Sequence, residues 1–158
     1  MINLGRYKAT GLPNVHLPLT ALDWVLTGLA VALMLTIWVL IALFYPVLSV
    51  RGYDFFASGG ASVLITVLFI WSARAPVRFI NFPVRVHEQN IERQYFLMSR
   101  FMRVITVVMN LLFLFVLLGN LEAHWGIKEG TFAFVSFAIL AILVASFVVY
   151  YVMAMRWR

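Results

Sequence analysis

Two carboxylates four residues apart, Glu88 and Glu92, form the pair whose spacing could support chemistry. On one face of a helix, such a pair can bind a metal ion or act as an acid and a base, as carboxylates do in helical-bundle sites. No histidine completes a metal site here, and Arg85 and Arg93 are the better partners for the two glutamates. We therefore interpret this stretch as a solvated and partly ion-paired surface.

Residues that commonly catalyse reactions or bind metals are otherwise scarce. The chain has no cysteine, which excludes disulfides, thiolate metal sites and cysteine nucleophiles. Its three histidines, His16, His87 and His124, fall in different segments and cannot form one metal site. No nucleophile and base can be paired by their positions. The sequence therefore predicts no catalytic residue, no metal and no cofactor, and we expect a protein that is not an enzyme.

Asn110 is the one strongly polar side chain near the middle of a long apolar run. It could line a substrate site, or it could form a hydrogen bond across helices, which contributes about 0.6 kcal/mol and at most about 2 kcal/mol. We favour the structural role because no second polar group is tied to Asn110 by its spacing. Hydroxyl side chains in the apolar runs are expected to bond to their own helix backbone. These are Thr27, Thr36, Ser62, Thr66, Thr106, Ser136 and Ser146.

Four apolar runs must position these residues. Of the 158 residues, 64% are hydrophobic and 11% are charged, whereas soluble domains have about 45–50% and about 25%. Helices of this length can cross a hydrocarbon core about 30 Å thick. The sequence thus predicts an all-α integral membrane protein with a single domain, residues 1–158. Its four predicted transmembrane helices are about 22–45, 56–73, 103–119 and 131–155.

The basic residues are distributed unevenly between the connecting segments. Ten of the twelve lysines and arginines lie in the two terminal tails and the middle loop, if Arg103 at the start of the third span is counted with that loop, and only Arg51 and Lys128 lie in the other two loops. The positive-inside rule then places both termini and the loop 74–102 in the cytoplasm. We attribute the net charge of +6 to this topology and to attraction by the lipid bilayer, and not to nucleic-acid binding. No charged residue lies near the middle of a span, which argues against a pump or a proton-coupled transporter.

The third transmembrane helix is predicted to extend into the cytoplasm as an amphipathic segment. Nothing between Glu88 and Gly119 breaks a helix. Four apolar residues recur at spacings of four, three and four, which marks one face of a helix. They are Ile91, Tyr95, Met98 and Met102. Charged residues lie mostly off this stripe, namely Glu88, Glu92, Arg93, Arg100 and Arg103.

Small residues at a spacing of four permit close approach of two helices. Two such pairs occur, Gly28 with Ala32 and Ala141 with Ala145. They could form a dimer face or could pack within the four-helix bundle. We favour packing within the bundle, because a four-helix protein must first pack against itself.

Residues 81–95, which read NFPVRVHEQNIERQY, resemble the signature of a bacterial membrane domain of unknown function. That domain also forms the front part of the sporulation-delay toxin immunity protein. Residues 19–24 (LTALDW) resemble the family's N-terminal pattern, and the likeness covers roughly residues 19–118. The chain departs from the family in its first outside loop, since residues 46–54 lack the histidine motif usual there. The resemblance implies four spans in a bacterial inner membrane and, loosely, an immunity or signalling role.

Three functions remain open at this point. We favour a non-enzymatic membrane protein that acts through protein–protein interaction, including toxin immunity or signalling, because the only patterned polar surface is predicted to face the cytoplasm. A protein partner or a second copy would bind this surface. The predicted partner-binding residues are Glu88, Glu92, Arg93 and Tyr95. The alternatives are an accessory subunit of a larger membrane complex and a small transporter or lipid-handling protein.

Overall fold

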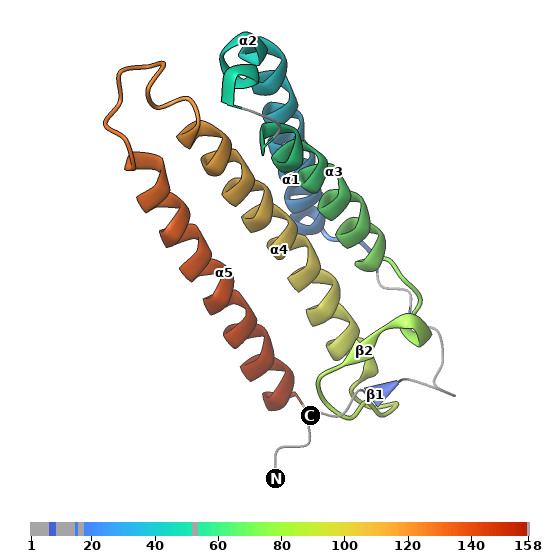
Figure 1. The fold of residues 1–158 in the computed structure, drawn as a ribbon. Helices are drawn as coiled ribbons and strands as arrows, with labels where there is room; N and C mark the ends of the chain where they lie inside the picture. The colour runs from blue at the N-terminus through green and yellow to red at the C-terminus, as the bar shows by residue number, and fades with distance from the viewer. Residues whose placement is uncertain (1–6, 9–14, 16–17, 52–53, 158) are drawn as a thin grey trace.

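Four long helices form an antiparallel bundle in the computed structural model, which describes residues 7–8, 15, 18–51 and 54–157 (Figure 1). They are α1 (Ala21–Leu43), α3 (Asp54–Ser72), α4 (Ile91–Gly119) and α5 (Thr131–Arg156). Each is long and apolar enough to cross a membrane. The helical class and the four apolar helices are therefore confirmed. In the described part of the chain the only strands are one pair of two residues each.

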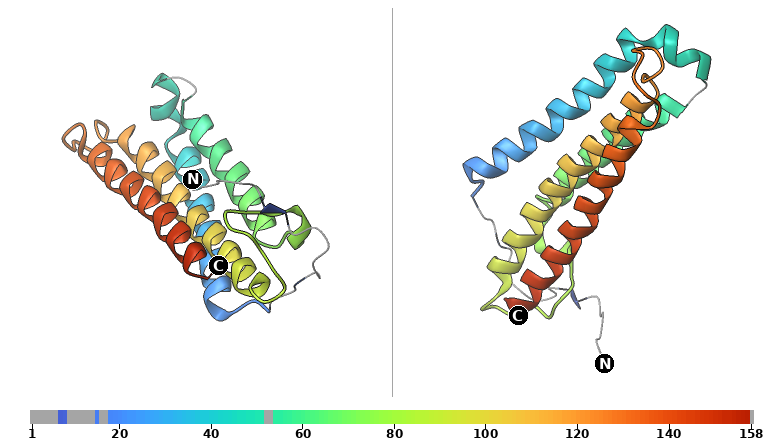
Figure 2. Two further views of the ribbon diagram at one scale, coloured as in Figure 1. Left: turned by 90° about the horizontal axis from the view of Figure 1, so that it is seen from below. Right: turned by 90° about the vertical axis from the view of Figure 1, so that its left-hand side faces the viewer.

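The central helix of the bundle is α4. It packs against α1, α3 and α5, whereas α5 packs chiefly against α4 (Figure 2). A helix surrounded by neighbours is shielded from lipid, so polar side chains on it must find their partners inside the protein. Three of the buried polar residues of α4 are Gln94, Arg103 and Asn110.

The first helix ends at Leu43, two residues before the predicted end. Pro46 has no amide hydrogen to donate to the Ala42 carbonyl, and its ring would crowd that carbonyl. The chain instead forms a new short helix, α2 (Tyr45–Leu48), with the proline in its first turn, and then the 3-10 turn η1 (Ser49–Arg51). The proline therefore both stops α1 and starts the turn that leads to α3.

A glycine brings α1 and α3 together near this end. A Cβ atom at Gly59 would lie 2.8 Å from Cδ1 of Ile41 and 3.2 Å from Cζ2 of Trp38. A larger residue here would have to displace the side chains of Ile41 and Trp38, so glycine permits the close approach of the two helices. The glycine near the start of α3 is thus explained by helix packing.

The segment between α3 and α4 folds against one end of the bundle. It contains the 3-10 turn η2 (Val77–Phe79) and the strand β2 (Asn81–Phe82), which pairs antiparallel with β1 (Tyr7–Lys8). Apolar side chains of this segment form a core with the start of α4. The core consists of Ala75, Val77, Ile80, Phe82, Ile91 and Tyr95. The middle loop is therefore packed onto the bundle.

The helix α4 is unbroken over its 29 residues, as predicted from the lack of helix-breaking residues. It begins at Ile91, three residues after the predicted start. Glu88 lies in the preceding turn, where Oδ1 of Asn90 accepts a hydrogen bond from the backbone N–H of His87 at 2.7 Å. The extension of its first turns into the cytoplasm stays a prediction.

Candidate functional site

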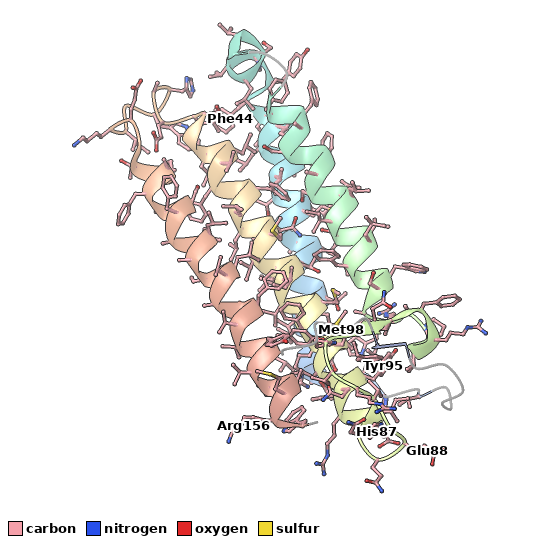
Figure 3. The ribbon with its side chains drawn as sticks, turned by 60° about the horizontal axis from the view of Figure 1, so that its bottom comes forward. Phe44, His87, Glu88, Tyr95, Met98 and Arg156 are labelled. Carbon is pink, nitrogen blue, oxygen red and sulfur yellow. The ribbon has the colours of Figure 1, made fainter. Side chains whose placement is uncertain are left out.

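The two ends of the bundle differ in charge. At the end where α4 begins, the described side chains include seven arginines and only three carboxylates, and we call it the basic end. The arginines are Arg74, Arg78, Arg85, Arg93, Arg100, Arg103 and Arg156, and the carboxylates are Asp23, Glu88 and Glu92. Figure 3 shows Arg156 and Glu88 at this end and Phe44 at the opposite end. Charge thus distinguishes the two faces that the membrane would separate.

A buried polar cluster centred on Asn110 lies at mid-depth of the bundle. Oδ1 of Asn110 accepts a hydrogen bond from the Ser62 hydroxyl at 2.5 Å. Nδ2 donates to Oγ1 of Thr66 at 2.8 Å and to the carbonyl of Ala30 at 3.2 Å. The amide therefore uses both of its donor hydrogens within the protein and joins α1, α3 and α4.

These contacts confirm that Asn110 forms hydrogen bonds across helices. The prediction that Ser62 and Thr66 bond to their own backbone is wrong, because helix packing brings both hydroxyls to Asn110. The other five hydroxyl residues do bond to the carbonyl four residues earlier in their own helix. They are Thr27, Thr36, Thr106, Ser136 and Ser146. An amide with both donors occupied offers little to a substrate, which weighs against the transporter alternative.

A second polar cluster, at the basic end, contains a buried ion pair. Arg103 is 2% exposed, and its Nη1 lies 3.4 Å from Oδ1 of Asp23. The same nitrogen donates to Oγ of Ser99 at 2.7 Å. Nε of Arg100 lies 3.7 Å from the same carboxylate oxygen. The carboxylate is held in place because its Oδ2 accepts the backbone N–H of Thr20 at 2.9 Å, in the capping box that starts α1.

This ion-pair cluster joins α1 and α4 to the end of α3, because the Ser99 hydroxyl also donates to the carbonyl of Ala73, the residue that follows α3, at 2.7 Å. A cavity of about 220 Å³ lies beside it, lined by Arg103, Arg74 and Tyr95 among others. Arg103 lies off the apolar stripe of α4, and it is nevertheless buried. Its partner Asp23 is 80 residues away in sequence, so spacing within one helix could not reveal the pair.

Polar side chains also hold both ends of α5. Nε2 of Gln94 donates to the carbonyl of Ala154 at 2.9 Å, near the last turn of α5. The carboxylate of Glu122 accepts the backbone N–H of Gly130 at 2.6 Å and that of Phe132. A carboxylate at a helix N-terminus is electrostatically favourable. The sequence analysis missed both contacts, which fix the position of the largely apolar α5 against α4.

The four predicted partner-binding residues do not share one surface. Glu88, Glu92 and Arg93 are exposed at the basic end, whereas Tyr95 is 7% exposed. Figure 3 shows Glu88 at the outer edge of the molecule and Tyr95 closer to the helices. Tyr95 is part of the core beneath the middle segment, because it lies on the apolar stripe of α4. We therefore remove it from the candidate docking surface, and the role of the other three stays a prediction.

The histidines are well separated where the structure describes them. His124 packs edge-on against Phe44, with ring centroids 5.9 Å apart, at the end opposite to His87 (Figure 3). Among the described residues, no three histidine, aspartate or glutamate side chains gather as a metal site would require. His16 lies outside the described residues, as do Arg6 and Arg158.

Both pairs of small residues lie on the outside of the bundle. Gly28 and Ala32 are exposed on α1, and a Cβ built at Gly28 would meet no atom within 4 Å. Ala141 and Ala145 are exposed on α5. The prediction that these pairs pack within the bundle is wrong, because α4 occupies the faces of α1 and α5 that turn inward.

Neither protein-family models nor curated proteins nor solved structures yield a match to this chain. The resemblance of residues 19–118 to the bacterial membrane domain therefore stays a prediction.

Proposed function

We propose that this chain is a non-enzymatic protein of a bacterial inner membrane that acts through protein–protein interaction. The observation that supports this most is the contrast between its two kinds of polar residue. Asn110, at mid-depth, has its amide donors bonded inside the bundle, whereas Glu88, Glu92 and Arg93 are exposed together at the basic end. Toxin immunity or signalling is the specific version that the resemblance of residues 19–118 implies.

The proposed threading places the basic end in the cytoplasm. The concentration of arginine at this end is the distribution that the positive-inside rule describes. We then expect a reporter that functions only in the cytoplasm to be active when it is fused after residue 89, and a reporter that functions only in the periplasm to be inactive there. Activity of the periplasmic reporter at this position would contradict the proposed membrane topology. It would also contradict a docking surface in the cytoplasm.

The docking surface can be tested by replacing Glu88, Glu92 and Arg93 together with alanine. We expect recovery of a crosslinked partner from cells to fall at least about fivefold, since energetically important interface residues contribute more than about 1 kcal/mol each. These side chains are exposed and lie outside the core, so insertion and helical content should not change. Tyr95 is left intact because its truncation would disturb packing.

The matched control is the pair Lys128→Ala and Glu129→Ala, which removes exposed charges from the opposite end. Its partner recovery should equal that of the wild type. Unchanged recovery with the triple variant would contradict the docking proposal.

A second candidate is an accessory subunit of a larger membrane complex. It is favoured by the exposed small residues on α1 and α5, which a neighbouring helix could approach closely. Purification of the crosslinked protein with its partners distinguishes the two functions. A large assembly recovered equally by the wild type and by the triple-alanine variant would favour the accessory role. A small species without any partner would contradict it.

A further inference from the structure

An apolar groove runs between α4 and α5 at the basic end. Its volume is about 430 Å³, with Val104 and Ile142 toward the middle of the bundle and Trp157 at the outer end. Phe101 and Tyr150 stack within it, with ring centroids 4.2 Å apart and planes 14° from parallel. The groove is within the range of about 300–1,000 Å³ that is usual for small-molecule sites.

Arg100 is the one charged residue lining this groove among those that the structure describes. Its guanidinium carbon lies 4.1 Å from the centre of the Phe96 ring, and Phe96 also lines the groove. Arg100 and Arg103 share a single carboxylate oxygen of Asp23, at 3.7 and 3.4 Å. Residues 1–17 contain no aspartate or glutamate that could add a second negative charge. Asp23, Arg100 and Arg103 together therefore carry one net positive charge.

The groove lies at the depth that a phospholipid would need. Nη2 of Arg100 donates to Oγ1 of Thr20 at 3.3 Å, so the guanidinium is level with the start of α1. From Tyr150 to Ile142 the groove extends inward by eight residues, or about 12 Å at 1.5 Å per residue. This is less than half of a hydrocarbon core about 30 Å thick. A phosphate at Arg100 would thus lie at head-group level, and an acyl chain in the groove would lie in the hydrocarbon.

We propose that the groove binds one anionic phospholipid, with its phosphodiester on Arg100 and an acyl chain between α4 and α5. A zwitterionic phospholipid also has a phosphate, but its own cation cancels the charge that the basic end attracts. Phe101 follows Arg100 in the chain and stacks on Tyr150, and aromatic side chains are common at this interfacial depth. This proposal does not depend on the protein-docking function.

Native mass spectrometry of the purified chain tests the proposal, with phosphatidylglycerol or phosphatidylcholine added to the detergent. We expect one phosphatidylglycerol to bind more tightly than any phosphatidylcholine. Arg100→Gln should reduce that preference about fivefold, the effect of one basic residue near a lipid surface. Ala145→Trp, which fills the groove and leaves the ion-pair cluster untouched, should reduce it as well.

The matched control is Arg85→Gln, which removes the same charge from an exposed position at the same end but does not line the groove. It should keep the preference of the wild type. An equal loss in Arg85→Gln and Arg100→Gln would show diffuse attraction and overturn the proposal. Equal binding of the two lipids would also overturn it. A dimer that binds no phosphatidylglycerol and is broken by Ala145→Trp would assign the groove to a second copy instead.

Discussion

Asp23→Ala is expected to lower the free energy of unfolding by about 3–5 kcal/mol, the usual loss when one partner of a buried ion pair is removed. Arg103 is 2% exposed, so its charge would stay buried without its carboxylate partner, with Ser99 as the remaining hydrogen-bond partner. The capping box with Thr20 would be lost as well. Titration of the purified protein with dodecyl sulfate in mixed micelles, followed by circular dichroism, measures this difference.

Restoring the charge balance should recover most of that stability. Asp23→Ala combined with Arg103→Leu removes both charges, and apolar replacement of a whole buried pair is often nearly neutral. Glu129→Ala, at an exposed carboxylate of the opposite end, is the matched control and should change stability by less than about 0.5 kcal/mol. A double variant less stable than Asp23→Ala alone would show that the pair does not explain the loss.

Asn110→Leu is expected to lower the free energy of unfolding by about 2 kcal/mol, from three hydrogen bonds of about 0.6 kcal/mol each. The bonds to Ser62, Thr66 and Ala30 hold α1, α3 and α4 together at mid-depth. Leucine is branched at the same carbon and is not smaller than asparagine, so the loss would come from the polar contacts and not from a cavity. The same detergent titration provides the measurement.

Asn120→Leu is the control for this substitution. Asn120 caps the end of α4, and its Nδ2 donates, among the described residues, only to the carbonyl of Val116 in that same helix, at 3.1 Å. Asn120→Leu should therefore leave the contacts between α1, α3 and α4, and their contribution to the free energy of unfolding, unchanged. If Asn110 is structural, folded Asn110→Leu protein should also recover its crosslinked partner within about twofold of the wild type. A stable variant that loses a measurable transport activity would assign Asn110 to a substrate path.

Much of the architecture could be predicted because it depends on local properties of the chain. The length of each apolar run determines whether a helix can cross the hydrocarbon core. Four transmembrane helices were predicted, and among the described residues four helices are long and apolar enough to cross a membrane. The lack of helix-breaking residues between Glu88 and Gly119 predicted one long helix, and α4 is unbroken from Ile91. Errors at the boundaries were local too, as at Pro46, which ends α1 two residues early.

The helices, their apolar character and the uneven distribution of arginine all follow from the amino-acid sequence. Which polar side chains meet depends on how the helices pack, and these meetings define the polar clusters of the candidate site. Ser62 is 48 residues from Asn110, Gln94 is 60 from Ala154, and Asp23 is 80 from Arg103. Helical periodicity relates residues on one helix, but it does not specify which faces of different helices pack together. Buried polar groups must nevertheless find partners, and here those partners come from other helices.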